Sequence, residues 1–187
     1  MPNPHIIVDT NEIRMTDDDG APSLHVMRPT YLDKERYYWF PMIEVARTKQ
    51  GVTNSSVLVA HTELTLPLQA GALYQLDGFI EWDATGTIAQ QMNLSAPSGS
   101  TGTWSASEFI SGAGTCNGVA PTAIGTPADG LNGMGGSAVM HWHLKGWVRT
   151  GGTAGNITVE FARDSGGVAN QTIYIVPGSW IRVQRVA

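Results

Sequence analysis

Alternating apolar and polar residues mark the last third of the chain as a set of extended strands. The run 139–148 carries its apolar side chains on one face, namely Met140, Trp142, Leu144 and Val148. A period of two residues is typical of a strand with one buried and one exposed face. The same period recurs over residues 73–82 and 156–161, and glycine-rich turns separate the runs. This pattern predicts an all-β fold, a meander or a Greek key, without sustained helical periodicity.

The strand signals predict a domain over residues 52–187. Within it, the segment 83–86 reads Asp-Ala-Thr-Gly between the runs 73–82 and 87–94, which predicts a hairpin. Residues 96–137 form a tract rich in glycine, serine and threonine with few apolar residues, and we expect a long loop there. That loop is either an irregular crossover pinned to the sandwich or a presented loop that contacts a receptor or a neighbouring subunit.

Residues 1–51 differ from the rest because they hold clustered charges, several prolines and a run of aromatic residues. Prolines interrupt any long helix in this region. Two interpretations stay open: short strands and turns packed against the main sheet, or an extended arm that reaches a neighbouring subunit. In the second case Trp39 and Phe40 would be the anchors.

Composition excludes several classes of function. The formal net charge is −5, and the 11 lysines and arginines are scattered, so nucleic acid is not an expected partner. No apolar run reaches the ~18 residues of a membrane span, and the first residues lack the features of a signal peptide. We therefore expect a protein made in a cytosol. Charged residues make up only 14% of a chain with 22 glycines and 6 tryptophans, a balance that suits a surface used for assembly.

The candidate chemistry is weak. His141 and His143 point the same way on one strand and could share a metal ion, as in the jelly-roll enzymes called cupins. Lys145, Gly146 and Trp147 stand where a cupin carries its glutamate, and no histidine follows Pro177-Gly178, so two of four ligands are missing. We expect no cofactor, and expect the two histidines to line a subunit interface or a wet sheet face. Around a three-fold axis they could hold an ion or make assembly sensitive to pH.

Other catalytic and ligand-binding motifs fail on inspection. Counting from Asp17, the twelfth residue of a calcium loop would be Arg28 rather than glutamate. The sequence contains no Gly-x-Ser-x-Gly element and no glycine-rich nucleotide loop. The single Cys116 allows no disulfide within the chain and no cysteine metal cluster. We therefore expect a protein that is not an enzyme.

Four segments together resemble the jelly-roll module of tailed-bacteriophage virion proteins. They begin at Gly71, Thr122 and Gly155, and the most specific is the closing segment Val176-Pro-Gly-Ser-Trp-Ile-Arg-Val183. The resemblance covers about residues 52–187. It implies an antiparallel β-sandwich whose protomers associate around a three-fold axis.

The resemblance also implies a function. It suggests a non-enzymatic virion structural protein, assembled in the host cytoplasm, most plausibly a trimeric minor tail or fibre component that contacts the host surface. Three alternatives stay open: a capsid decoration protein, a carbohydrate-binding module in which Trp104 or Trp82 stacks on a sugar, and, least favoured, a cupin-like metalloenzyme.

The expected partners are copies of the same chain, other virion proteins, and a host glycan or receptor. The side chains expected to contact them are aromatic residues and histidines: Tyr38, Trp39, Phe40, Trp104, Phe109, His141, His143 and Trp147.

Overall fold

The structure is a computed structural model. It describes residues 5–8, 13–16, 22–27, 41–86, 88–110, 116–129, 140–164 and 170–186. Contacts divide the chain into two units, Met1–Phe40 and Pro41–Ala187. The second unit therefore begins eleven residues earlier than predicted, at residue 41 rather than 52. The reason is that residues 42–45 and 50–53 are strands of the large sheet, whereas the sequence pattern had assigned residues up to 51 to the N-terminal region.

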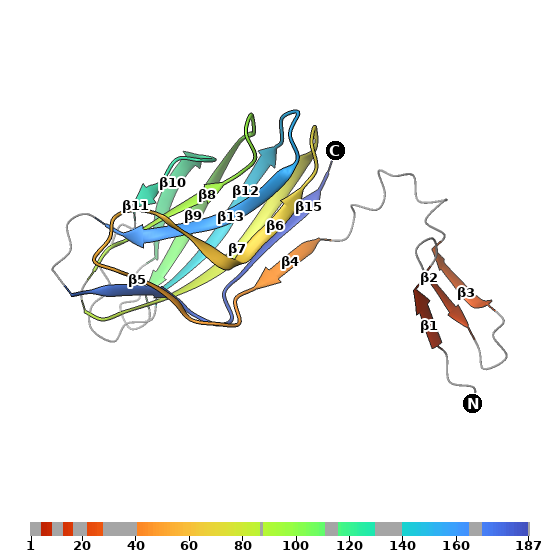
Figure 1. Cartoon of the computed structure of the whole chain (residues 1–187), viewed down its shortest axis with the longest axis horizontal. Helices are drawn as coiled ribbons and strands as arrows, with labels where there is room; N and C mark the ends of the chain where they lie inside the picture. Colours follow the sequence, from red (N-terminus) through yellow and green to blue (C-terminus); the bar gives the residue numbers. More distant parts are fainter. Residues whose placement is uncertain are drawn as a thin grey trace. The chain divides into compact units, whose positions relative to one another are not determined.

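The N-terminal unit is a small antiparallel sheet in the order β1-β2-β3 (Figure 1). Its strands are β1 (His5–Val8), β2 (Ile13–Thr16) and β3 (Pro22–Met27). Short strands are thus present in this region, and its contact with the main sheet or with a neighbouring subunit stays a prediction. The predicted contact residues Tyr38, Trp39 and Phe40 lie outside the described residues.

The C-terminal unit is built from two antiparallel sheets. The eight-stranded sheet has the order β10-β9-β12-β7-β14-β5, with β15 paired to β7 and β4 paired to β15. Its strands are β4 (Met42–Val45), β5 (Gln50–Thr53), β7 (Leu73–Ala84), β9 (Thr101–Ile110), β10 (Cys116–Ala123), β12 (Met140–Arg149), β14 (Thr172–Ile175) and β15 (Trp180–Arg185). The four-stranded sheet, in the order β11-β8-β13-β6, consists of β6 (Val59–Leu68), β8 (Gln90–Ser95), β11 (Ala128–Asp129) and β13 (Gly155–Arg163). The all-β, antiparallel prediction is confirmed.

From β6 to β14 the chain passes back and forth between the two sheets, except that β9 and β10 both belong to the eight-stranded sheet. β6, β8 and β13 belong to the four-stranded sheet, whereas β7, β12 and β14 belong to the eight-stranded sheet (Figure 1). The predicted hairpin between residues 73–82 and 87–94 is therefore wrong, and so is a simple meander. Alternation along a strand specifies which face is buried but not which strand is its partner. The jelly roll stays a prediction with which this strand order is compatible.

The predicted long loop at residues 96–137 is also wrong for most of its described part. β9 and β10 pair as an antiparallel hairpin and extend the edge of the eight-stranded sheet beyond β12. The inner face of β9 carries Trp104 and Ala106, two positions apart, while serine and threonine occupy the outer face up to Phe109. Because most of the outer residues are small and polar, the sequence of this strand resembles that of a loop.

The inner faces of the two sheets form one hydrophobic core. Its largest fully buried side chains include Trp82, Trp142 and Phe161. The rings of Trp82 and Phe161 meet across the two sheets at 6.0 Å between centroids, and Trp82 meets Trp142 edge to face at 5.5 Å. Packing of inner faces of this kind makes a β-sandwich. In the described part of the chain, no helix has the length and hydropathy needed to cross a membrane.

A buried polar link joins the two sheets inside this core. Gln90 of β8 donates from Nε2 to Oε1 of Glu108 on β9 at 3.0 Å, and the Trp142 indole Nε1 donates to the same oxygen at 3.2 Å. All three side chains are fully buried. Buried polar groups are stable only when they are hydrogen-bonded, so these bonds fix the relative position of β8, β9 and β12.

The motif Pro177-Gly178-Ser179-Trp180 links β14 to β15, which both pair with β7. Gly178 has φ = 96°, a conformation that favours glycine. The Ser179 hydroxyl is buried and accepts the backbone N–H of Glu81 at 2.9 Å. The motif therefore turns the chain while keeping it attached to β7, which gives its residues a structural role.

Candidate interaction surface on the eight-stranded sheet

The outer face of the eight-stranded sheet carries four of the predicted contact residues, Phe109, His141, His143 and Trp147. On β12, even-numbered residues point into the core, so His141, His143, Lys145, Trp147 and Arg149 line the opposite face. This confirms the two faces that the sequence predicted for residues 139–148. β12 pairs with β7 on one side and with β9 on the other, and β15 pairs with β7. These registers decide which side chains lie beside the outward-facing residues of β12.

One part of this face is a cluster of two histidines and two phenylalanines, Phe79, Phe109, His141 and His143, which we call the His–Phe cluster. Phe79 stacks on His141 and meets His143 edge to face, both at 5.1 Å between ring centroids. Phe109 also meets His143 edge to face at 5.1 Å, and 42% of its surface is exposed. Four rings in contact on a solvent-facing sheet form an apolar area typical of a protein interface.

Phe79 and Trp180 also lie in this area, and neither was predicted from the sequence to be a contact residue. Phe79 occupies a position on the polar face of the run 73–82, and Trp180 lies directly opposite it in the register of β7 and β15. The signal available in the sequence was an aromatic residue at a position where alternation predicts a polar one. Only the strand pairing shows that Phe79 and His143 are neighbours.

A charged row lies beside the His–Phe cluster. Asp77 of β7 accepts hydrogen bonds from Lys145 Nζ on β12 and from the Arg182 guanidinium on β15, its partners in register. Burial of the Asp77 carboxyl would raise its pKa, but the hydrogen bonds and charges of Lys145 and Arg182 outweigh burial and lower that pKa below its ordinary value. The carboxylate therefore holds three strands of the sheet together.

Replacing Asp77 with asparagine should make the stability of the protein less dependent on acid pH. A lowered pKa in the folded state means that the ionised carboxyl stabilises the fold fully above its ordinary pKa, and that this contribution disappears as the pH falls through the lowered value. We expect Asp77→Asn to cost about 1 kcal/mol at pH 7, since Lys145 is largely exposed and its charge is screened. The loss measured by urea unfolding should shrink toward pH 3. An equal loss at both pH values would contradict this account.

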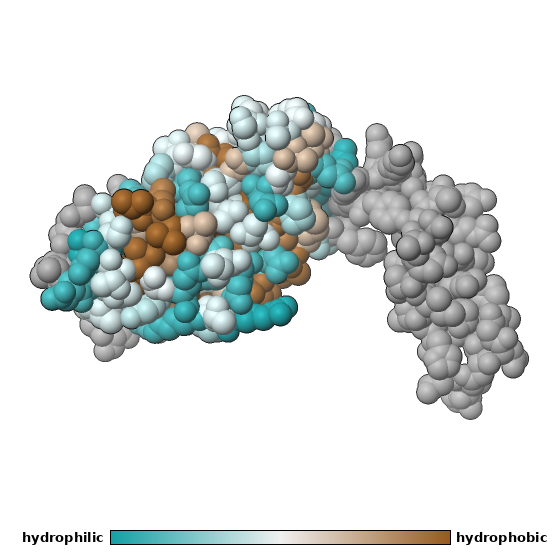
Figure 2. Space-filling model, in the orientation of Figure 1, coloured by the Kyte–Doolittle hydropathy of each residue, from teal (hydrophilic) through white to brown (hydrophobic). Residues whose placement is uncertain are grey.

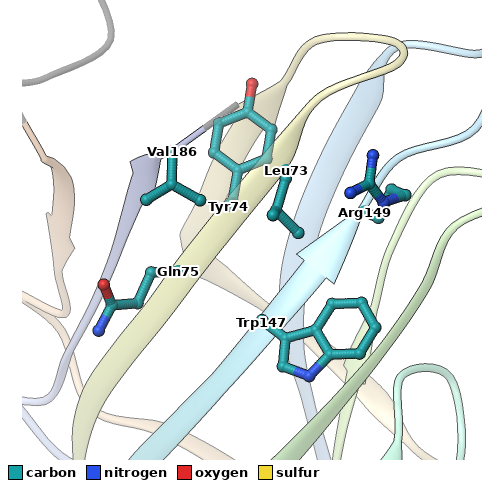
Figure 3. A pocket seen from close by; sticks show the side chains of 6 residues that line it. All are labelled: Leu73, Tyr74, Gln75, Trp147, Arg149 and Val186. Atoms are coloured by element: carbon teal, nitrogen blue, oxygen red, sulfur yellow. The ribbon is translucent and has the colours of Figure 1, made fainter.

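Trp147 lies on the other side of the charged row. Its indole is 44% exposed, and it borders two shallow hollows in the surface. The first, of about 370 Å³, is also lined by Leu73, Gln75, Arg149 and Val186 (Figure 3). The second, of about 300 Å³, contains Thr103, Ser105 and Lys145. Trp147 and His143 are four residues apart on one strand, so their Cα atoms are about 13 Å apart.

The structure thus divides the predicted contact residues into separate groups. Phe109, His141 and His143 come together, and Trp147 stands apart beyond the charged row. Trp104, which was also predicted to contact partners, is 1% exposed and faces the core. The reason is the alternation of β9, which turns Trp104, Ala106 and Glu108 inward, and Gly146 opposite Trp104 allows close approach because an added Cβ would come within 3.0 Å of the Trp104 Cβ. Trp82 is fully buried as well.

The histidine pair is not accompanied by further ligands in the described ranges. These residues contain no group of three or more histidine, cysteine, aspartate or glutamate side chains that could hold a metal ion. Oε2 of Glu81 lies 4.0 Å from Nδ1 of His141. The rings of Phe79 and Phe109 contact the two imidazoles.

A second exposed apolar area lies away from this face. Val57 and Val59 are 72% and 41% exposed at the segment that joins β5 to β6. Figure 2 shows a hydrophobic area where this segment crosses the molecule in Figure 1, surrounded by polar and weakly polar residues. It provides a comparison site for tests of the outer face of the eight-stranded sheet.

Comparisons with known proteins give little further information. No protein-family model matches the chain, and no curated protein matches it. Two solved structures of infectious bursal disease virus are similar over 100% of this chain: the Gt strain, with 15% identity and a TM-score of 0.17, and the Gx strain, with 11% identity and a TM-score of 0.20. The chain spans 43% and 42% of the length of those chains. At these TM-scores the similarity carries no argument about this protein.

Proposed function

We propose that this protein is a non-enzymatic structural component of a virion, built as a homotrimer through the part of the outer face of its eight-stranded sheet that holds the His–Phe cluster. The observation that carries the proposal is the His–Phe cluster, where four rings meet on a face that the sandwich leaves uncovered. A second copy that covers this face would remove the exposed apolar surface of Phe109 from water, which favours association.

The surroundings of the cluster support assembly rather than catalysis. Val45 of β4 is exposed and extends the apolar area past Trp180, its partner in register, and the exposed Ile43 lies beside Arg182 on the same strand pair. The tailed-phage resemblance of the closing motif adds the trimer and the virion location to the proposal. Within the class, a minor tail or fibre component is our first choice, and its contact with a host surface is part of the proposal.

The proposal is tested by the subunit mass of variants on two apolar areas. In native mass spectrometry the unaltered chain should be a trimer without bound metal. Phe109→Asp should convert it to monomers, because three buried carboxylates would replace apolar contacts. Val57→Asp, a matched change at the other apolar area, should leave the trimer intact.

Two results would contradict the proposal. A monomeric protein with one metal ion per chain would favour an enzyme and make His141 and His143 ligand candidates again. Dissociation by Val57→Asp with no effect of Phe109→Asp would place the interface on the opposite side of the sandwich. Circular dichroism of each variant confirms that the sheets are intact.

A further inference from the structure

We infer that Trp147 and Arg149 form a binding site for an acidic sugar, a saccharide ring that carries a carboxylate or a phosphate. The inference deepens the host-surface contact of the proposed function. It replaces the sugar-stacking role that the sequence suggested for Trp104 and Trp82, whose indoles are buried.

The first observation is the position of the indole. Trp147 stands on a flat sheet face with a hollow on each side, so a ring lying on the indole could extend into either one. Figure 3 shows Trp147 and Arg149 projecting from the same strand, with Leu73 and Gln75 on the adjacent strand. An exposed aromatic ring binds the apolar C–H face of a sugar, and flanking polar groups bind its hydroxyls.

The second observation is a ring of polar side chains around the indole. Gln75 and Thr103 are its direct partners in register on β7 and β9, at about 5 Å between Cβ atoms. Within the described ranges, the side chains of Gln75, Thr103 and Ser105 make no hydrogen bond to the protein. Their donors and acceptors are therefore available to a ligand.

The third observation is local charge. Arg149 has no ion-pair partner in the described part of the chain, and Lys145 and Arg182 share the single carboxylate of Asp77. This part of the face therefore has three cations against one carboxylate, in a chain whose net charge is −5. A guanidinium beside an aromatic platform favours an anionic sugar over a neutral one.

The site is separate from the proposed trimer contact. The charged row of Asp77, Lys145 and Arg182 lies between Trp147 and the His–Phe cluster on β7, β12 and β15. Sugar binding and association can therefore be measured independently on the same protein.

The test uses nuclear magnetic resonance of the full chain with three probes: methyl glucuronide, glucose 6-phosphate and neutral methyl glucoside. The Trp147 indole N–H signal is assigned by its loss in Trp147→Ala. We expect both anionic probes to shift this signal with dissociation constants near 1 mM, and methyl glucoside to bind about tenfold more weakly. Arg149→Gln should reduce binding of the anionic probes to that of methyl glucoside.

The possible results of this titration lead to different conclusions. A response to only one anionic probe identifies carboxylate or phosphate as the recognised group. No shift with either anionic probe at tens of millimolar, or equal binding of all three, overturns the inference. Phe109→Asp serves as the control, because it changes the proposed trimer contact and leaves Trp147 and Arg149 unaltered. Sugar binding by the dissociated variant would show that the sugar site does not depend on the trimer.

Discussion

Replacing Trp104 with alanine is expected to lower the free energy of unfolding by about 3–5 kcal/mol, the usual cost of removing a large buried aromatic side chain. The indole belongs to the hydrophobic core, and 1% of its surface is exposed. Truncation would leave a cavity between β9 and β12 that rigid strand pairing cannot close. The melting temperature should fall by about 6–20 °C for a domain of this size.

The conservative variant Trp104→Phe separates packing from hydrogen bonding. The Trp104 indole Nε1 is buried and finds no acceptor among the described residues, so phenylalanine gives up no hydrogen bond there. We expect most of the stability to return with phenylalanine, measured by thermal unfolding of the three proteins. The change Trp147→Ala removes a tryptophan that is part of neither the core nor the His–Phe cluster, and it should alter the free energy of unfolding by less than about 0.5 kcal/mol. A Trp104→Ala protein as stable as the parent would show that the indole is not part of the core.

Replacing Glu108 with alanine is expected to cost about 2–4 kcal/mol, because it adds a cavity to the loss of two hydrogen bonds. The Trp142 indole N–H would lose its acceptor, and the Gln90 amide would lose its bond to Glu108 and keep its contact with Met140 Sδ. Both groups are fully buried, so water cannot replace the carboxylate without entering the core. Urea unfolding at neutral pH measures the loss.

Glu108→Gln is the matched control for this prediction. Glutamine keeps an oxygen acceptor and nearly the same volume, so we expect a loss of about 1 kcal/mol or less. Comparing the losses of unfolding free energy in the two variants shows how much of the effect of Glu108→Ala comes from the hydrogen bonds and the cavity. Equal losses for alanine and glutamine would attribute the effect to the negative charge, and no loss for either would contradict the role of the link.

The sequence predicted the faces of the strands better than their partners. The buried side chains of β7 and β12 were correct because alternation is a local property of the backbone. The hairpin after residue 82 was wrong because a short connection permits either pairing or a crossing to the other sheet. The residues of β9 were predicted to form a loop because most of its outer residues are serine and threonine, which are common in loops and also occur in strands.

The candidate site shows the same division. His141, His143 and Trp147 were identified from the polar face of one strand, whereas Phe79 and Asp77 became part of the site only through strand register. Trp104 was misplaced because an isolated tryptophan among small residues gives no sign of its face. Its position opposite Gly146 comes from a pairing between segments about forty residues apart, which one sequence does not reveal.

The pairing of β7 has a consequence for how the protein forms during synthesis. One edge of β7 pairs with β12, and the other edge pairs with β14 and β15, which lie far from β7 in the sequence. Contacts between such distant segments slow folding, because a large loop must close before they form. Both edges of β7 can therefore be paired only after β15 has been synthesised, and until then this central strand has an unpaired edge on which aggregation can start.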